Sequence, residues 1–387
     1  MYSLLEIFYF SIFNVLNSIK YPHYWICVFI SFLQYSKIGK IEKDILGTYK
    51  RPPLLNTFYA SFYGLFGGIL GSMIFVYLKV IIDQRDFMYM LPLSLLLSMI
   101  HPRLICFSYS GGIISLISLL TRWPSINVTG IMFVVGILHL VESALVLLDG
   151  TRTKVPVFIE RKGKLAGGYT LNSFWPVPFT IYINGGIPRP TILLAILGYG
   201  DYTLSNYPSK KAKESASLLF TFSMMLITLA RLSVDYSLFK YISAIFSPLA
   251  HEIIIALGKH NEKSIDDINN SIPNGIRVFE VLPNTIGKKM GISPGDIILS
   301  INGKRILSPR DLESIIYYKP KIILAKVFNM KKGVTLKEYI SNDESIDNLG
   351  LIVVPNEPEY TLIEEESKST LLRAFNKFSQ KKLTFKN

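Results

Sequence analysis

Cysteine is scarce in this 387-residue chain, and acidic residues are fewer than basic ones. The two cysteines, Cys27 and Cys106, both lie inside apolar runs, which argues against a disulfide framework and against a thiolate metal site. The N-terminus lacks the basic start and the small-residue cleavage site of a secretory signal, so we expect residues 1–36 to be retained.

The charge excess is concentrated in the first two thirds of the chain. Lys and Arg total 41 against 28 Asp and Glu, and residues 1–257 hold 21 of these bases against 12 of the acids. Basic residues between apolar segments are what the positive-inside rule and attraction to anionic lipid predict. Because no nucleic-acid motif accompanies the charge, we expect the lipid bilayer as a partner and no nucleic acid.

Long hydrophobic runs, by contrast, are abundant. Half of the residues are hydrophobic and the mean hydropathy is +0.35, which water-soluble folds rarely show. We therefore expect a polytopic α-helical membrane domain of about seven or eight spans over residues 1–257, followed by a small α+β domain. The candidate spans are residues 21–36, 57–81, 87–100, 103–121, 127–149, 176–200 and 215–246, with 4–19 and 236–257 as further spans or surface helices.

Two basic connecting segments, Lys37–Asn56 and Thr151–Trp175, are predicted to face the cytoplasm. Four candidate spans separate them and two more follow, so the even numbers place the C-terminal domain in the cytoplasm too. The cluster Lys210, Lys211 and Lys213 is then predicted to lie outside, against the positive-inside rule.

A glycine stripe marks the span at 57–81. Gly64, Gly67, Gly68 and Gly71 form two overlapping Gly-xxx-Gly pairs, a spacing that lets another helix approach closely. We favour packing within the bundle, with a homo-oligomer interface as the alternative.

Residues 275–330 carry the clearest pattern in the chain. A strand-like alternation leads to a short helix ending at Gly291, a Pro-Gly turn, a second strand and a tight hairpin at Asn302-Gly303. A helix beginning at Ser308 and a last strand follow. The run VLPNTIGKKMGISPGDIILSINGKRILSPRDLESII closely resembles bacterial PDZ domains. We assign residues 258–355 to a PDZ-like domain and 356–387 to a charged C-terminal tail, with a surface helix around Phe375 as one interpretation of the tail.

The PDZ resemblance implies a peptide site. Such a domain adds an extended peptide as a strand beside its own sheet edge, with a side-chain pocket between that strand and the second helix. By position we expect the pocket at Ile276, Val278, Leu312 and Ile316, with core packing as the alternative.

The loop that holds the peptide carboxylate, an apolar-Gly-apolar run, is missing upstream of the first strand, where the bacterial family usually has it. Leu349, Gly350 and Leu351 offer a substitute downstream, as a permuted strand, or else form a plain edge strand.

A PDZ domain beside membrane spans raises the question of an intramembrane metalloprotease, which needs two His one helical turn apart and an Asp ligand elsewhere. His251-Glu252 supplies half of the motif, because Ile255 stands where the second His is required, and Asp149 precedes it in the wrong order. A serine protease needs a soluble catalytic domain, which no segment is long enough to supply. We therefore expect no enzyme activity, no catalytic residue, no metal site and no cofactor.

His139 and Glu142 lie one turn apart in a candidate span, where ionisable groups are functional candidates. We favour a structural hydrogen-bonded pair over a proton relay, because no chain of further carboxylates follows.

Three stretches of the apolar half resemble the MinJ-like membrane proteins of bacterial division sites: RLICFSYSGGIISLISLL from Arg103, HLVESALVLLDG from His139 and GGYTLNSFWPVP from Gly167. The resemblance implies a cell-membrane scaffold at the septum and poles that bridges a DivIVA-like protein to MinD and MinC. The sequence therefore predicts a non-enzymatic scaffold whose PDZ domain binds partner proteins. The alternatives are a PDZ-containing membrane protease or its regulatory subunit, and a transporter-like protein with a regulatory PDZ domain.

Overall fold

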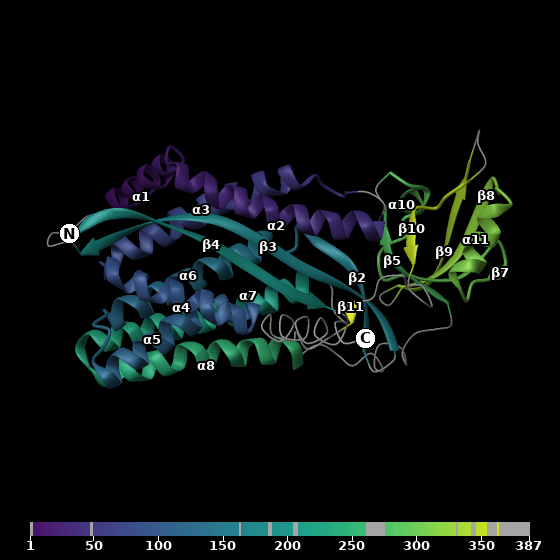
Figure 1. The fold of residues 1–387 in the computed structure, drawn as a ribbon. Helices are drawn as coiled ribbons and strands as arrows, with labels where there is room; N and C mark the ends of the chain where they lie inside the picture. The colour runs from purple at the N-terminus through teal and green to yellow at the C-terminus, as the bar shows by residue number, and fades with distance from the viewer. Residues whose placement is uncertain are drawn as a thin grey trace, which may run out of the picture.

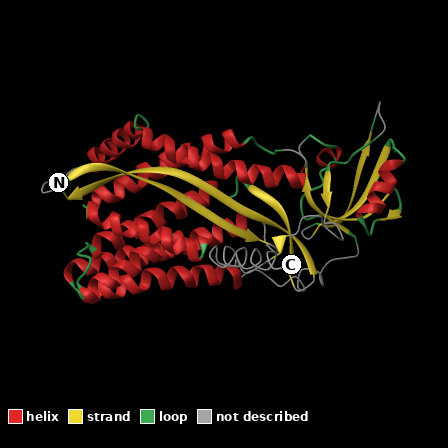
Figure 2. Cartoon of the chain, viewed as in Figure 1, coloured by secondary structure: helices red, strands yellow, loops and turns green. Residues whose placement is uncertain are grey.

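A computed structural model describes residues 3–46, 49–161, 164–184, 188–203, 208–260, 275–282, 284–329, 332–341, 346–353 and 362–363. Figure 1 shows an elongated helical bundle with a long β-hairpin laid along it, and a small domain at one end of the bundle. Figure 2 shows that strands dominate the small domain and helices the bundle. The bundle ends with α8 (Leu238–His260), and the small domain begins with β5 (Ile276–Val281).

Helices make up most of the bundle. Besides α8 they are α1 (Leu4–Ser18), α2 (Pro22–Leu46), α3 (Pro53–Tyr77), α4 (Gln84–Ile100), the 3-10 helix η1 (Pro102–Ile105), α5 (Phe107–Thr121), α6 (Val128–Asp149) and α7 (Pro208–Asp235). Among the described helices, α3, α6, α7 and α8 are long and apolar enough to cross a membrane, and α1 and α5 are apolar but shorter. The N-terminal part is thus a helical region with several apolar helices.

Two of the expected spans are wrong. Residues 176–200 lie in a β-hairpin formed by β3 (Lys164–Asn184) and β4 (Arg189–Thr203), not in a helix. Prolines inside this stretch deny a helix its backbone hydrogen bonds, and the aromatic and β-branched residues around them favour strands. Residues 215–246 belong to two helices, because the chain turns at Tyr236-Ser237 between α7 and α8.

The hairpin presents one edge to the helices. β3 pairs with β4 on one side. On the other side it pairs with β2 (Lys154–Arg161) near its start and with β1 (Ile81–Asp83) at its end. Between these, residues 172–181 of β3 have no strand partner on that side among the described residues.

The N–H groups on this unpaired side are satisfied in an unusual way. The N–H of Phe174 donates to the hydroxyl of Tyr35, on α2, at 3.0 Å. The N–H of Thr180 donates to Ser72 Oγ, on α3, at 2.8 Å. The alternate positions between them are Pro176 and Pro178, which have no N–H to satisfy. Because a buried, unpaired N–H is costly in apolar surroundings, this pattern closes the edge chemically.

The glycine stripe of α3 packs against the same edge. A Cβ on Gly64 or Gly68 would meet the backbone oxygen of Pro176 or Pro178, and one on Gly71 would meet the ring of Phe179. The stripe therefore serves a contact within the chain, in which a helix backbone approaches a strand.

The helices α4, η1 and α5 form a hairpin that enters the bundle and returns. Its outer ends lie together, since the rings of Tyr89 and Trp123 pack edge to face with centroids 6.2 Å apart. At its turn, the sulfur of Cys106 lies 3.1 Å from Nε2 of His139, in the middle of α6. Residues 87–100 and 103–121 are thus largely helical, but they do not cross as the two expected spans, because they enter and leave at the same end.

The small domain has a mixed helix and strand order. After β5 come α10 (Ile286–Lys289), β6 (Ile297–Ile301), β7 (Lys304–Arg305), α11 (Pro309–Tyr317), β8 (Ile322–Asn329), β9 (Gly333–Ile340) and β10 (Leu351–Val353). The sheet order is β10-β5-β6-β8-β9, with β7 on β6. Asn302 and Gly303 both have positive φ (49° and 81°), as a tight hairpin requires. Every element predicted over residues 275–330 is present.

Of the C-terminal tail, the structure describes β11 (Leu362–Ile363), which pairs in parallel with β2 of the bundle. The predicted surface helix around Phe375 lies outside the described residues.

Candidate functional site

The segment that holds Leu349, Gly350 and Leu351 ends in an edge strand of the small domain. β10 runs antiparallel to β5, with Leu351 opposite Val281 and Ile352 opposite Glu280. Its other edge has no strand partner among the described residues. The chain therefore places a strand from downstream at the sheet edge beside β5, which fits both interpretations of the sequence, a permuted strand and a plain edge strand.

The loop before β10 requires glycine at its centre. Gly350 has φ +66°, and a Cβ there would collide with the side chain of Thr285. The carbonyl of Gly350 accepts from the N–H of Leu282 at 2.9 Å, and that of Leu349 accepts from the N–H of Gly287 at 2.8 Å. These bonds fix the loop against the start of α10.

A partly open apolar surface lies between α11 and the sheet. Leu312, Ile315 and Ile316 of α11 pack against the core together with Leu351 and Val353, yet all five remain partly exposed. α11 has no fully buried residue. An unpaired strand edge beside such an apolar helix face can accept an extended peptide, because main-chain hydrogen bonds and side-chain pockets are both at hand.

Two of the four expected pocket residues are misplaced. Ile276 and Val278 are 4% and 0% exposed, because β5 is an inner strand that β10 covers on its edge. They belong to the core and present no surface to a peptide. Leu312 and Ile316 do lie on the partly open face. Sequence reasoning missed Ile315, although its spacing from Leu312 is that of one helical turn.

The small domain is attached to the bundle through β5. The ammonium of Lys50 lies 2.8 Å from the Glu280 carboxylate. The ring of Tyr169, from β3, stacks on Phe279 with centroids 5.0 Å apart, and its hydroxyl donates to the Phe279 carbonyl at 2.6 Å. Burial raises the pKa of Tyr169 above its ordinary value, so this hydroxyl stays protonated and remains a donor. The attachment leaves the outer edge of β10 free.

A cavity of about 290 Å³ lies at this junction, between α2, β2 and the small domain. Its lining is strongly basic and also contains two acids: Lys50, Arg51, Arg152, Lys154, Lys288, Glu42 and Glu280. The end of the bundle that carries the small domain is therefore also electropositive.

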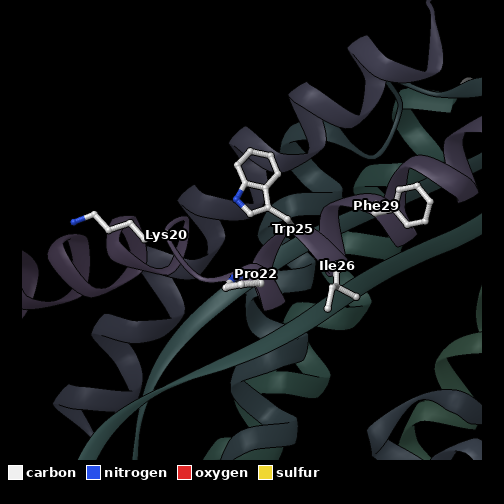
Figure 3. A pocket seen from close by; sticks show the side chains of 5 residues that line it. All are labelled: Lys20, Pro22, Trp25, Ile26 and Phe29. Atoms are coloured by element: carbon white, nitrogen blue, oxygen red, sulfur yellow. The ribbon is translucent and has the colours of Figure 1, made fainter.

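A shallow hollow lies at the turn between α1 and α2. Figure 3 shows Lys20 pointing away from Trp25 and Phe29, with Pro22 and Ile26 between them. Aromatic residues beside a lysine are typical of a membrane–water interface.

Inside the bundle, the ionisable residues that the sequence singled out are placed differently than expected. The ring nitrogens of His139 bond Val135 and Cys106, in place of the expected pairing with Glu142. Asp149 forms an ion pair with Arg152 and accepts from the Trp175 indole at 2.8 Å. It is outside the one group of metal-ligating side chains found among the described residues.

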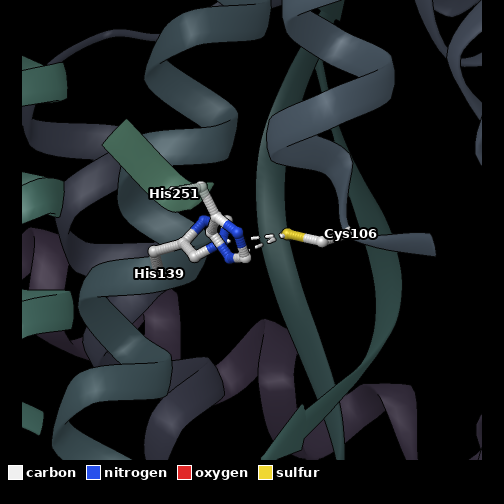
Figure 4. Close-up of side chains that lie close together, drawn as sticks. All are labelled: Cys106, His139 and His251. Carbon is white, nitrogen blue, oxygen red and sulfur yellow. Dashed lines mark hydrogen bonds between the residues drawn. The ribbon is translucent and has the colours of Figure 1, made fainter. Parts of the chain in front are cut away.

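That group consists of Cys106, His139 and His251, shown in Figure 4. The three residues come from the start of α5, the middle of α6 and α8, so no sequence spacing reveals them. The only signal is that each is a rare ligand type in an apolar run.

Residues 277–323 match a family model described as PDZ domain. A protein of Buchnera aphidicola subsp. Acyrthosiphon pisum (strain APS), described as "Probable serine protease do-like", is 41% identical over 58 residues. That stretch is 15% of this chain and 12% of the Buchnera protein, so the likeness covers a small part of each. The family match and the sheet order together identify the C-terminal domain of this chain as a PDZ domain.

Proposed function

We propose that this protein is a non-enzymatic membrane scaffold whose PDZ domain binds an extended segment of a partner protein between β10 and α11. The observation that carries this proposal is the unpaired edge of β10 together with the partly exposed apolar residues Leu312 and Ile316, which pack against the same core as Leu351. A PDZ domain accounts for partner binding, and several apolar helices account for attachment to the bilayer. Neither part requires a chemical reaction.

The geometry of the bundle supports an orientation with the PDZ domain in the cytoplasm. The β3–β4 hairpin and the α4–α5 hairpin both return to the end from which they start, so α3, α6, α7 and α8 remain as the candidate crossings. α7 then begins where α8 ends, because Lys211 donates to the Gly258 carbonyl at 2.6 Å.

The positions of the basic segments in the same arrangement also support a cytoplasmic PDZ domain. The cluster around Lys211 follows the end of β4, where Thr203 pairs with Tyr169 beside the PDZ domain, so it lies at the end of the bundle that carries Lys50 and Arg152. All the basic segments therefore share one end, as the positive-inside rule requires of a cytoplasmic face. Replacing the expected span 176–200 with a hairpin and dividing 215–246 into two helices leaves two crossings, an even number, after Trp175.

We further propose that the scaffold acts in division-site placement, with DivIVA-like and MinD-like proteins as its partners at the septum and poles. The support is the likeness of the stretches that form α5, α6 and part of β3 to MinJ-like proteins. This likeness also fits the order of helices followed by one PDZ domain.

One experiment tests both the side of the membrane on which the PDZ domain lies and the position of the protein in the cell. A fluorescent protein that folds only in the cytoplasm is fused after Asn387 and imaged in growing cells. Signal at septa and poles is expected. A uniform membrane signal would contradict the division role and keep the orientation, and a dark but well-expressed fusion would contradict the orientation.

The peptide site is tested by a bacterial two-hybrid assay of the full chain against the host's DivIVA-like and MinD-like proteins. Leu312→Arg places a charge on the partly open apolar surface between α11 and the sheet, called the groove below. It is expected to abolish any interaction made through this groove. Tyr317→Arg is the matched control, because this residue is on the same helix and is 82% exposed. Equal signals from both variants would rule out the groove, and no signal from the unaltered protein would rule out these partners.

One observation favours a second candidate, a membrane protease or its regulatory subunit: the stretch shared with a protein described as protease-like. Release of fluorescent peptides from labelled casein by the purified protein, lost in His251→Gln, would favour this alternative. The scaffold proposal expects no release.

A further inference from the structure

Three soft or borderline ligands converge inside the bundle. The sulfur of Cys106 lies 3.1 Å from Nε2 of His139 and 3.6 Å from Nε2 of His251. Figure 4 shows the sulfur pointing toward both imidazole rings. The three ligand atoms lie within 4.8 Å of one another.

Hydrogen bonds on the far side of each ring fix the tautomer. Nδ1 of His139 donates to the Val135 carbonyl at 2.7 Å, which leaves Nε2 with a lone pair. The Tyr109 hydroxyl donates to Glu252 at 2.7 Å, so its oxygen accepts from Nδ1 of His251 at 3.2 Å. Both Nε2 lone pairs are therefore directed at Cys106. An outer hydrogen bond that orients an imidazole in this way is characteristic of metal-binding histidines.

A hydrogen-bonded cluster explains this arrangement poorly. A neutral thiol carries one proton and can donate it to one acceptor. The cluster holds two acceptors, on His139 and His251, so one lone pair would remain unmatched at a site where His139 is 3% exposed. A cation among the three atoms satisfies all of them at once.

The spacing fits a small tetrahedral ion. Zinc bonds of about 2.3 Å to sulfur and about 2.0 to 2.1 Å to nitrogen place S and N about 3.5 Å apart at a tetrahedral angle. The two S···N distances here, 3.1 and 3.6 Å, lie on either side of this value.

The surroundings complete the site. The ring of Phe222 packs edge to face on both imidazoles, at centroid distances of 5.1 Å from His139 and 5.9 Å from His251. A thiolate, two neutral imidazoles and a divalent ion leave one net positive charge. The carboxyl group of Glu142, one turn after His139 and within electrostatic range of Cys106, can offset this charge once it is ionised.

We propose that Cys106, His139 and His251 bind one Zn²⁺ ion, which joins the α4–α5 hairpin, α6 and α8 and keeps a fourth position open. On binding, the Cys106 thiol loses its proton to solvent and its sulfur bonds the metal. The site is independent of the scaffold proposal, because it concerns the bundle and not the PDZ groove.

The test uses Co²⁺ as the probe with the full-length protein in detergent, after removal of metals by a chelator. One bound Co²⁺ per chain is expected, with visible d–d bands of tetrahedral cobalt and a near-ultraviolet thiolate-to-cobalt band. Added Zn²⁺ should displace the cobalt and abolish both signals, because zinc binds such sites more tightly.

Matched variants separate ligation from folding. Cys106→Ser is expected to lose the thiolate band, and His139→Gln or His251→Gln to weaken cobalt binding at least tenfold. Cys27→Ser and His23→Gln are the controls, since they change the same residue types on α2, and both should bind as the unaltered protein does. Each variant is compared only if its size-exclusion profile matches that of the unaltered protein. Absence of a thiolate band in the unaltered protein, or its persistence in Cys106→Ser, would overturn the proposal.

Discussion

Each of the two sheets of this molecule has a strand edge without a strand partner among the described residues, and the two edges differ in whether other groups cover them. The edge of β3 in the bundle is closed by hydroxyl acceptors, by Pro176 and Pro178, and by the glycine stripe of α3. The edge of β10 in the PDZ domain has no such cover among the described residues. An unpaired edge invites another strand, so one edge is protected against pairing and the other is available for it.

The largest expected effect is on the closed edge. Gly64→Leu forces a side chain into the Pro176 backbone oxygen, which is fixed by the β3–β4 ladder. We expect a loss of more than about 3 kcal/mol of stability, the upper range for overpacking, and an aggregated bundle by size exclusion. Gly200→Ala is the control, because its Cβ would meet an ordinary contact at 3.5 Å. A monodisperse Gly64→Leu protein would show that α3 and β3 do not pack as described.

The second effect concerns the loop that leads into the open edge. Gly350→Ala must place a Cβ at positive φ and against Thr285. The left-handed conformation alone costs about 1–2 kcal/mol. We expect increased hydrogen exchange in β10 and loss of partner binding, with the bundle unchanged. Exchange in the peptides of α6 and α7 is the internal control, and faster exchange there would contradict the prediction.

The third effect tests the hydroxyl acceptors of the closed edge. Ser72→Ala leaves the Thr180 N–H without its acceptor. Leaving a buried donor unsatisfied costs about 1–3 kcal/mol, so the thermal midpoint should fall. Ser36→Ala is a matched control, because Ser36 bonds only a carbonyl of its own helix. Equal midpoints for the two variants would show that the edge is not closed in this way.

The smallest effect is electrostatic and lies at the start of α11. The N–H groups of Leu307 and Ser308 donate to the Asp311 carboxylate and hold its pKa below the ordinary value. A depressed pKa stabilises the folded state above the ordinary carboxyl value of about 3.9, and this stabilisation is lost as the pH falls through the lower, folded-state value. We expect the protection of α11 against hydrogen exchange, relative to the intrinsic rate at each pH, to decrease below about pH 4. Asp311→Asn should exchange faster at neutral pH and show a weaker pH dependence, and an unchanged pH profile would contradict the assignment.

The PDZ domain is predictable from its sequence because its signals are local. Turn residues such as Gly291 and Asn302 and the capping residue Ser308 each determine a short stretch of backbone. The role of Ile276 and Val278 was not predictable in this way, since it depends on β10, which joins β5 from about 70 residues downstream.

The bundle was predictable only in part, for the same reason. Hydropathy located the apolar helices, but it does not distinguish a helix from a strand that packs on one, and residues 176–200 were therefore misassigned. The meeting of Cys106, His139 and His251 depends on the packing of three distant helices, which no periodicity encodes.

The closed edge of β3 also has a consequence for the order of synthesis. α3 and α6 precede the hairpin in the chain, so the surface that receives β3 is complete before the ribosome reaches Lys164. The backbone N–H groups of Phe174 and Thr180 can leave water only when their acceptors, the hydroxyls of Tyr35 and Ser72, are already in place. The bundle is therefore expected to mature late in translation, and a chain released after α6 would expose the glycine residues of α3 that β3 otherwise covers.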